Sequence, residues 1–303
     1  MPLPEPPPVG ESMLPPGVFA GTTVVITGGG TGLGRAIATE FGRLGAAVGI
    51  VSRREEHRQA GVAAVESVGG RAAHAAADVR RPDEVSAAFD AIENELGPVR
   101  VVVNNAAANF PVPAENLSPN GWRAVAQIVL DGTFFCSQEL FRRASAAGEP
   151  GAICNILATQ SFTGGPGMVH TSAAKAGVGN LTKTLAVEWA PYGIRVNALA
   201  PGLFPHEDMR ADLQALRTEG EDVDARRSPA GRLGRLHELG WAVTWLCSPY
   251  AAFVTGHTLV VDGANWLRRD FVMPPFVPIR DQLSAVLSPE PTPPRATPGT
   301  ENP

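Results

Sequence analysis

Short apolar runs alternate with longer amphipathic stretches along most of the chain. The apolar runs are rich in β-branched residues and show little alternation with polar ones, as expected for parallel strands covered on both faces. One amphipathic stretch carries Asp83 and Glu84 at its start and Gly97 at its end, as helices do. The repetition predicts right-handed βαβ units and an α/β fold with a doubly wound parallel sheet. The expected strands are residues 23–27, 47–51, 71–77, 99–104, 151–157, 194–200 and 257–263.

Proline separates the folded part of the chain from its two ends. Segments this rich in proline bury too little apolar surface to offset the entropy of ordering, so they are expected to be disordered or extended. We expect residues 1–17 and 286–303 to be such segments, residues 18–264 to form a single domain, and residues 265–285 to form a C-terminal arm. The arm carries aromatic residues among prolines, and we expect it to pack on a neighbouring subunit.

Composition and charge exclude several classes of partner. The net charge of −5 gives no reason to expect a nucleic-acid ligand. The chain contains no run of about 18 apolar residues, so no membrane span is expected. Its start lacks the basic and apolar regions of a signal peptide. Three cysteines without motif spacing favour free thiols, no metal site and a cytoplasmic location.

A glycine-rich loop, in the sequence VVITGGGTGLGRA, joins the first strand to the helix that follows it. Glycine permits a tight turn, lets the backbone approach a diphosphate and allows close packing of helix on strand. The helix N-terminus adds unpaired N–H groups and the positive end of a dipole. The loop therefore predicts a dinucleotide cofactor bound by Gly28, Gly30, Thr31, Gly32, Leu33 and Gly34.

The end of the second strand indicates which dinucleotide is bound. An acidic residue there would accept hydrogen bonds from the ribose of NAD, whereas this chain has Ser52, Arg53 and Arg54. Guanidinium groups bind a 2′-phosphate through charge-assisted bonds, so we expect NADP(H). A solvated helix start is the alternative explanation of the arginines. After the third strand, Asp78 and Val79 are expected to contact the adenine.

Four motifs in this order resemble those of the short-chain dehydrogenase/reductase family. They are TGGGTGLG at 27–34, NNAA at 104–107, SAAKAG around Lys175 and RVNALAPG at 195–202. The resemblance implies a Rossmann fold with seven parallel strands and hydride transfer from a nicotinamide. It also implies a homotetramer or homodimer built on helices at 121–146 and 168–190. The implied cofactor contacts include Asn105, Ala106, Lys175, Pro201 and Gly202.

The segment NNAAANFPVPAENLSPNGW is similar to the 2,4-dienoyl-CoA reductases within that family. Asn109 and Phe110, followed by the helix start LSPNGW, carry this resemblance, together with TGGGTGLG and SRR. It implies an acyl thioester substrate, with CoA as the expected carrier, that contacts Asn109 and Phe110. Core packing is the alternative role of Phe110.

The chain lacks the tyrosine with which the family protonates a carbonyl oxygen. Thr171 stands at that position, Ala158 at the usual serine and Val129 at the usual helix asparagine, while Lys175 remains. A positioned acid contributes about 10²–10⁴-fold to a rate, and a threonine hydroxyl is too weak an acid to replace it. The substitution therefore argues against efficient reduction of a simple ketone.

The two tyrosines of the chain, Tyr192 and Tyr250, are not placed in the sequence to reach the site. Lys175 stands out because lysine is rare in this chain. Lys175 and Lys183 are the only lysines, against 23 arginines, so the chain has an ammonium group at position 175 although it uses arginine at almost every other basic position. A compact ammonium can bond both ribose hydroxyls, which a planar guanidinium cannot do in the same way. This contrast indicates that Lys175 is functional.

Four residues are candidates for the missing hydrogen-bond or proton donor. Asp131 could order a water molecule that protonates the substrate, or it could equally be a solvated or capping residue. Gln160 lies where mitochondrial-type dienoyl reductases are expected to carry a substrate-binding tyrosine. Thr171 could bond the substrate through its hydroxyl. His170 is a candidate because a histidine can act as an acid near neutral pH, although a histidine at a helix start is more often structural.

Three functions remain open from the sequence. The enzyme could reduce a conjugated 2,4-dienoyl thioester, where enolate stabilisation matters more than a tyrosine acid. It could be a carbonyl reductase of specialised metabolism with another proton donor, or a nucleotide-binding scaffold that has lost catalysis. Beyond Gly202, residues 203–230 hold arginines that could bind CoA phosphates or simply form a charged surface: Arg210, Arg217, Arg226 and Arg227.

Overall fold

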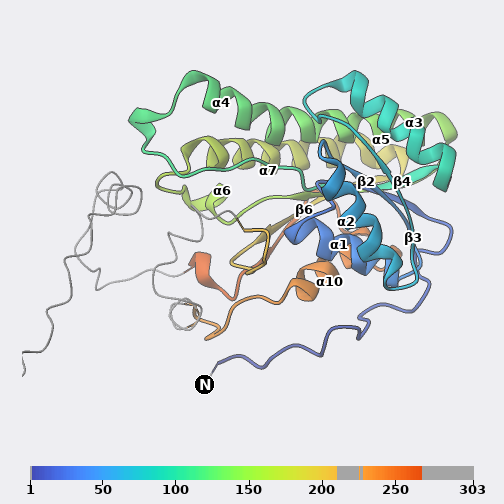
Figure 1. Cartoon of the computed structure of the whole chain (residues 1–303), viewed down its shortest axis with the longest axis horizontal. Coiled ribbons are helices and arrows are strands. Elements are labelled where there is room, and N and C mark those ends of the chain that lie inside the picture. The colour runs from blue at the N-terminus through green and yellow to red at the C-terminus, as the bar shows by residue number, and fades with distance from the viewer. Residues whose placement is uncertain (1, 210–224, 226–227, 268–303) are drawn as a thin grey trace, which may run out of the picture.

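Seven parallel strands form a single sheet with helices on both faces (Figure 1). The computed structural model describes residues 2–209, 225 and 228–267. The strand order is β3-β2-β1-β4-β5-β6-β7, which confirms the predicted fold class. The strands are β1 (Thr23–Thr27), β2 (Ala47–Val51), β3 (Arg71–Ala75), β4 (Val99–Asn104), β5 (Gly151–Ile156), β6 (Ile194–Pro201) and β7 (Thr258–Val261). β3, β5 and β7 are shorter than the sequence pattern predicted.

The helices form one layer on each face of the sheet (Figure 1). One layer comprises α1 (Gly32–Arg43), α2 (Glu55–Glu66) and α10 (Leu236–Cys247). The other comprises α3 (Pro82–Leu96), α4 (Pro119–Ala126), α5 (Gly132–Ala147) and α7 (Val169–Trp189). The short helix α6 (Gln160–Thr163) precedes α7.

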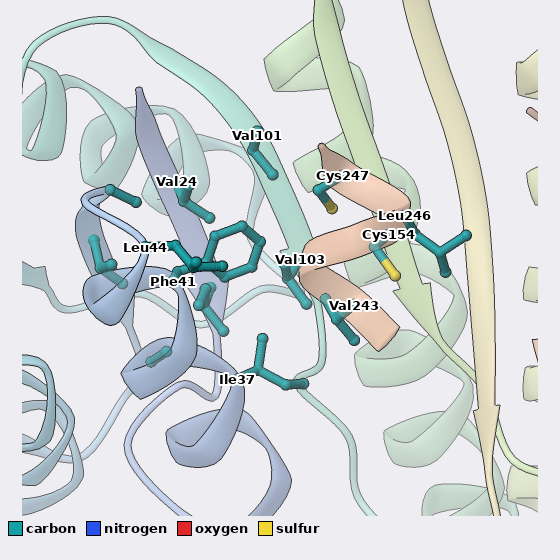
Figure 2. Close-up of a cluster of buried hydrophobic side chains, with 14 of the residues drawn as sticks. Val24, Ile37, Phe41, Leu44, Val101, Val103, Cys154, Val243, Leu246 and Cys247 are labelled. Carbon is teal, nitrogen blue, oxygen red and sulfur yellow. The ribbon is translucent and has the colours of Figure 1, made fainter. Parts of the chain in front are cut away.

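The two layers are held by strand residues that alternate between the faces. Val24 of β1 joins a core with α1 and α10, whereas Val25 joins the core beneath α3 and α5. Figure 2 shows the first core, where Phe41 of α1 and Val243 of α10 pack beside Val103 of β4. Each buried side chain of this size contributes about 1.5–3 kcal/mol relative to exposure. The continuous apolar strands of the sequence are therefore explained by burial on both sides.

From β1 the strand order runs through β2 to β3 on one side of the sheet, and from β4 it runs to β7 on the other side. The loops that follow β1 and β4 therefore lie next to each other at the carboxyl edge of the sheet. Ligands of open α/β sheets bind in the crevice at such a point, outside the carboxyl ends of the strands. The loop after β1 is the glycine-rich loop, and the loop after β4 carries Asn105 and Ala106. The topology thus brings two of the sequence motifs together.

The helix expected at residues 121–146 is interrupted. A π-helical turn, Gln127–Asp131, separates α4 from α5. Ser118 caps α4 by accepting a hydrogen bond from the N–H of Gly121 at 3.0 Å. π turns are rare and occur frequently at functional sites. Candidate residue Asp131 ends the turn, and Val129 lies within it.

The N-terminal segment lies extended along α10 and the residues before it. The N–H of Leu3 donates to the carbonyl of Ala230 at 2.7 Å, and Glu5 pairs with Arg235 at 2.9 Å. The indole N–H of Trp241 donates to the carbonyl of Glu11 at 3.2 Å. The sequence favours a disordered or extended segment at residues 1–17; in the structure these contacts hold part of it against α10.

None of the helices in the described part of the chain is long and apolar enough to cross a membrane. The same residues hold no group of three or more His, Cys, Asp or Glu side chains that could bind a metal ion. Cys136, Cys154 and Cys247 are buried free thiols.

Candidate functional site

The glycine-rich loop is closely packed between three elements. Gly28 and Gly32 have positive φ angles, +64° and +47°, which glycine adopts without strain. A Cβ atom on Gly30 would collide with the backbone of His57 in α2, and one on Gly34 would collide with the carbonyl of Gly28. The loop therefore has no room for side chains at these positions, and its backbone N–H groups lie at the start of α1, where a dinucleotide diphosphate binds in glycine-rich loops. The loop fits the expected cofactor.

Asn105 braces this loop. Its side-chain amide donates to the carbonyls of Thr27 and Gly28 at 3.0 and 3.1 Å. The hydroxyl of Thr27 accepts from the N–H groups of Asn105 and Ala106, both at 3.0 Å. The sequence predicted Asn105 and Ala106 as cofactor contacts, and these bonds show how β1 and β4 hold the loop between them.

A buried arginine that was not predicted from the sequence supports the end of β2, where the adenosine part of the cofactor is expected to bind. Arg58 of α2 is only 7% exposed, and its guanidinium donates to the carbonyls of Ser52 and Arg53 at 3.0 and 2.8 Å. The side chains of Arg53 and Arg54 are exposed at the end of β2, and the guanidinium of Arg53 lies 4.0 Å from the Asp78 carboxylate. In the sequence, nothing distinguishes Arg58 from an arginine on the exposed face of a charged helix.

Asp78 has a partner within the chain. Its carboxylate accepts two bonds from Nε of Arg80, at 2.9 and 3.0 Å, and one from the Arg80 N–H at 3.1 Å. These hydrogen bonds from Arg80 lower the pKa of the Asp78 carboxyl. Val79 is buried against Gly132 at the start of α5. The predicted adenine contacts are thus held firmly at the end of β3.

Lys175 is buried on α7 and points to the end of β5. Its Nζ donates to the carbonyl oxygen of Ile156. Burial lowers the pKa of the Lys175 ammonium to about 8. The charge therefore stands at the carboxyl edge of the sheet, where β5 lies beside β4.

The positions of the family's other catalytic residues are apolar or weakly polar. Thr171, one turn before Lys175, is buried. Val129 lies in an apolar cluster with Ala174 and Val178, where an asparagine would have a polar amide. Ala158 follows β5 and is half-buried. Within the described residues, Lys175 is thus the only member of the usual set in place.

His170 is buried beside the predicted substrate residues. Its ring packs edge-on against Phe110, with the centroids 4.4 Å apart. Both ring nitrogens are buried without a hydrogen-bond partner, as is Oδ1 of Asn109. Burial lowers the pKa of the His170 imidazole, so the neutral ring prevails at pH 7. Unpaired buried polar atoms are costly, which makes them candidates for binding a ligand.

Among the described residues, neither Gln160 nor Asp131 is joined to Lys175 by a hydrogen bond or an ion pair. Gln160 begins α6 and lines a surface hollow with Val169 and Ser172, and neither Lys175 nor Thr171 lines that hollow. Asp131 is half-buried at the end of the π turn. Their roles remain predictions.

Neither tyrosine lies near Lys175. Tyr192 is 54% exposed and packs on Phe141, beyond the C-terminal end of α7. At about 1.5 Å per residue, the helix carries it roughly 25 Å from Lys175. Tyr250 is 62% exposed in the turn after α10.

The described part of the C-terminal arm begins on its own subunit. Trp266 packs on Phe162 of α6, with ring centroids 5.3 Å apart. The remainder of the arm lies outside the described residues, as do the candidate phosphate ligands Arg210, Arg217, Arg226 and Arg227.

The chain is similar to known proteins over most of its length. The family profile described as enoyl-(acyl carrier protein) reductase matches residues 28–264. A probable (2E)-enoyl-CoA-producing 2,4-dienoyl-CoA reductase of Bacillus subtilis is 40% identical over 246 residues, covering 80% of this chain and 96% of the relative. A peroxisomal 2,4-dienoyl-CoA reductase of Mus musculus is 38% identical over 275 residues, covering 87% and 93%. A 3beta-hydroxysteroid dehydrogenase of Eggerthella lenta is 38% identical over 252 residues, covering 83% and 96%.

Solved structures show the same arrangement of strands and helices. A short chain dehydrogenase from Bacillus anthracis superposes with a TM-score of 0.74 at 40% identity, covering 82% of this chain and 98% of the other. A gluconate 5-dehydrogenase from Burkholderia cenocepacia, solved with NADP and tartrate, superposes with a TM-score of 0.75 at 36% identity, covering 82% and 97%.

Proposed function

The chain belongs to the short-chain dehydrogenase/reductase family, and on that premise we propose that it is an NADPH-dependent reductase of a conjugated 2,4-dienoyl thioester. CoA is the expected carrier. One observation carries the proposal: Lys175 is retained and buried, while Thr171 stands where the family's acid would be. The family uses nicotinamide cofactors, and the relatives named as 2,4-dienoyl-CoA reductases support this substrate class.

The choice of NADPH is supported by the end of β2. Arg53 and Arg54 extend into solvent there, and Arg58 fixes the backbone that presents them. Two guanidinium groups match the charge and geometry of a 2′-phosphate. The neighbour solved with NADP supports the same choice.

Reduction of a conjugated thioester needs less acid strength than reduction of a ketone. The nicotinamide supplies a hydride to the far carbon of the diene when it is bound. Charge then develops on the thioester oxygen, and hydrogen-bond donors aimed at that oxygen stabilise it. Lys175 would bind the nicotinamide ribose and place its positive charge beside this oxygen. The hydroxyl of Thr171 would donate a hydrogen bond without giving up its proton.

The proton that completes the reduction needs a separate source. Asp131, at the end of the π turn, would order a water molecule that protonates the carbanion. Gln160 would hold the thioester through its amide, and Asn109 and Phe110 would contact the acyl chain. The buried carbonyl Oδ1 of Asn109 is unpaired, which supports a polar contact with a ligand.

The proposal is tested by following oxidation of NADPH by the full chain with 2,4-hexadienoyl-CoA. The expected result is steady turnover that the singly unsaturated 2-hexenoyl-CoA does not support. Replacing Lys175 by methionine should abolish turnover, while the same change at exposed Lys183 on α7 should leave it unchanged. NADPH binding without turnover would instead favour a nucleotide-binding scaffold.

A second candidate function is carbonyl reduction. The relative named as a 3beta-hydroxysteroid dehydrogenase favours it, because that name denotes chemistry at a hydroxyl or ketone. His170 or a bound water would then have to supply the proton. NADPH oxidation with a panel of ketones, and none with the dienoyl thioester, would establish this alternative.

We also propose a cytoplasmic location and a homodimer or homotetramer built on α4, α5 and α7. The family resemblance supports the assembly, and light scattering of the purified chain tests it. Removing residues 265–303 tests the role of the C-terminal arm, because an arm that buttresses the assembly would leave smaller particles when it is lost. Cell fractionation with the intact chain tests the location.

A further inference from the structure

An acidic segment lies against the diphosphate-binding end of the glycine-rich loop. Residues 203–208 follow β6 and return to the start of α1. There the N–H of Gly32 donates a hydrogen bond to Oδ2 of Asp208 at 2.8 Å. Arg35, on the first turn of α1, pairs with the same carboxylate at 3.1 Å and also with Glu207. The Asp208 carboxylate thus accepts the hydrogen bond of a backbone N–H that is suited to bind an anionic ligand.

Two residues that precede Asp208 hold the segment in place. Phe204 is buried in the core beneath α1 and α10. The ring of His206 lies so close to Gly32 that a Cβ atom there would be 2.8 Å from its Cε1. Nδ1 of His206 is buried without a partner. The contact is therefore part of a packed arrangement, which the positive φ and missing side chain of Gly32 both permit.

The contact concerns the cofactor because of the amide it uses. The first N–H groups of a helix have no partner within the helix, and the helix dipole favours an anion there. In a glycine-rich loop that anion is the diphosphate. A phosphate oxygen and the Asp208 carboxylate cannot both lie at the N–H of Gly32, since like charges at that distance repel.

We propose that Asp208 is an internal competitor for the cofactor's diphosphate. The inference rests on the proposed function, which assigns the diphosphate to this loop. In the free protein Asp208 satisfies Gly32 and Arg35, and binding of the dinucleotide displaces it. The N–H of Gly32 then exchanges a carboxylate acceptor for a phosphate acceptor.

Displacement couples the cofactor site to the chain that leaves β6. Residues 203–208 continue directly from Pro201 and Gly202, which are expected cofactor contacts. When the diphosphate takes the N–H of Gly32, Asp208 moves away from α1, and this movement affects the same stretch of chain. Coupling between two binding events is reciprocal. Any change that weakens the Asp208 contact should therefore tighten the cofactor, and cofactor affinity reports the strength of the contact.

The test compares cofactor affinities of the full-length chain by titration of tryptophan fluorescence or by calorimetry. Asp208→Asn and Asp208→Ala should bind NADP⁺ about two- to fivefold more tightly than the wild type, the range expected for one anion at a helix N-terminus. Glu207→Gln is the matched control, because Glu207 pairs with Arg35 but does not touch Gly32. It should change the affinity little.

A second ligand separates competition from a general change in charge. Adenosine 2′-monophosphate lacks the diphosphate, so its affinity should be equal in the wild type and in both Asp208 variants. Unchanged or weaker NADP⁺ binding in those variants would overturn the inference, as would an equal gain for Glu207→Gln. Absence of nucleotide binding in every protein would instead overturn the proposed function.

Discussion

Replacing Lys175 by methionine should stabilise the cofactor-free protein at neutral pH. Burial lowers the pKa of the Lys175 ammonium from 10.5 to about 8, so the folded state binds this proton less tightly than the unfolded chain does. Below pH 8 the lysine is protonated in both states, and folding carries the full cost of burying the charge, about 3 kcal/mol. The cost decreases as the pH rises from 8 to 10.5 and vanishes above, where the lysine is neutral in both states.

Methionine avoids that cost but leaves the carbonyl of Ile156 without its hydrogen bond from Nζ. An unpaired buried carbonyl costs about 1 kcal/mol. The expected net gain is therefore about 2 kcal/mol in the free energy of unfolding at pH 7, falling to about zero near pH 10. Unfolding in urea, followed by circular dichroism at both pH values without cofactor, measures the difference.

Lys183→Met provides the matched control, because Lys183 is exposed on the same helix. Its effect should stay within about 0.5 kcal/mol at either pH. A Lys175→Met protein that is no more stable than the wild type at pH 7, or whose advantage does not shrink with rising pH, would show that burial of this charge carries no net cost. It would mean that the ammonium is compensated in the folded protein.

Three further predictions concern the cofactor loop and the candidate substrate site. Replacing both Arg53 and Arg54 by alanine should weaken NADPH about 10- to 100-fold and leave NADH unchanged in fluorescence titrations; equal losses for both cofactors would contradict a 2′-phosphate site. Gly30→Ala should lower the thermal midpoint and abolish cofactor binding, because its Cβ collides with α2, whereas Gly179→Ala, with ordinary contacts on α7, should preserve both. His170→Phe should keep the packing on Phe110, the stability and the dienoyl turnover, because the proposed reaction takes its proton through a water ordered by Asp131; a loss of turnover of about tenfold or more would show that the imidazole takes part in the reaction.

The sequence predicted the sheet and the glycine loop because both depend on local pattern. Short apolar runs gave the strands, and the position of Gly28–Gly34 between strand and helix marked the loop. Arg58 was missed because its burial and its bonds to two carbonyls arise from the folding of α2 against β2. The π turn was missed because residues 127–131 have the periodicity of an ordinary helix.

The long-range contacts of the site could not be read from the sequence either. Asp208 reaches Gly32 across 176 residues, and nothing near either residue marks them as partners. Thr171 is the opposite case. Its identity at a motif position was visible at once, and the structure adds that it is buried next to an unpaired His170. The cofactor-binding part of the site could therefore be predicted from sequence motifs, whereas the substrate-binding part depends on tertiary contacts.

In the proposed reaction the hydride goes to the far carbon of the diene in a conjugated thioester. Incubating the full chain with deuterium-labelled NADPH and 2,4-hexadienoyl-CoA, and locating the label by mass spectrometry and NMR, tests it most directly. The expected product is an enoyl-CoA with deuterium on the far carbon of the original diene, the carbon that bears the methyl group. Deuterium on a carbonyl carbon of a ketone substrate, with none transferred to the dienoyl thioester, would contradict it.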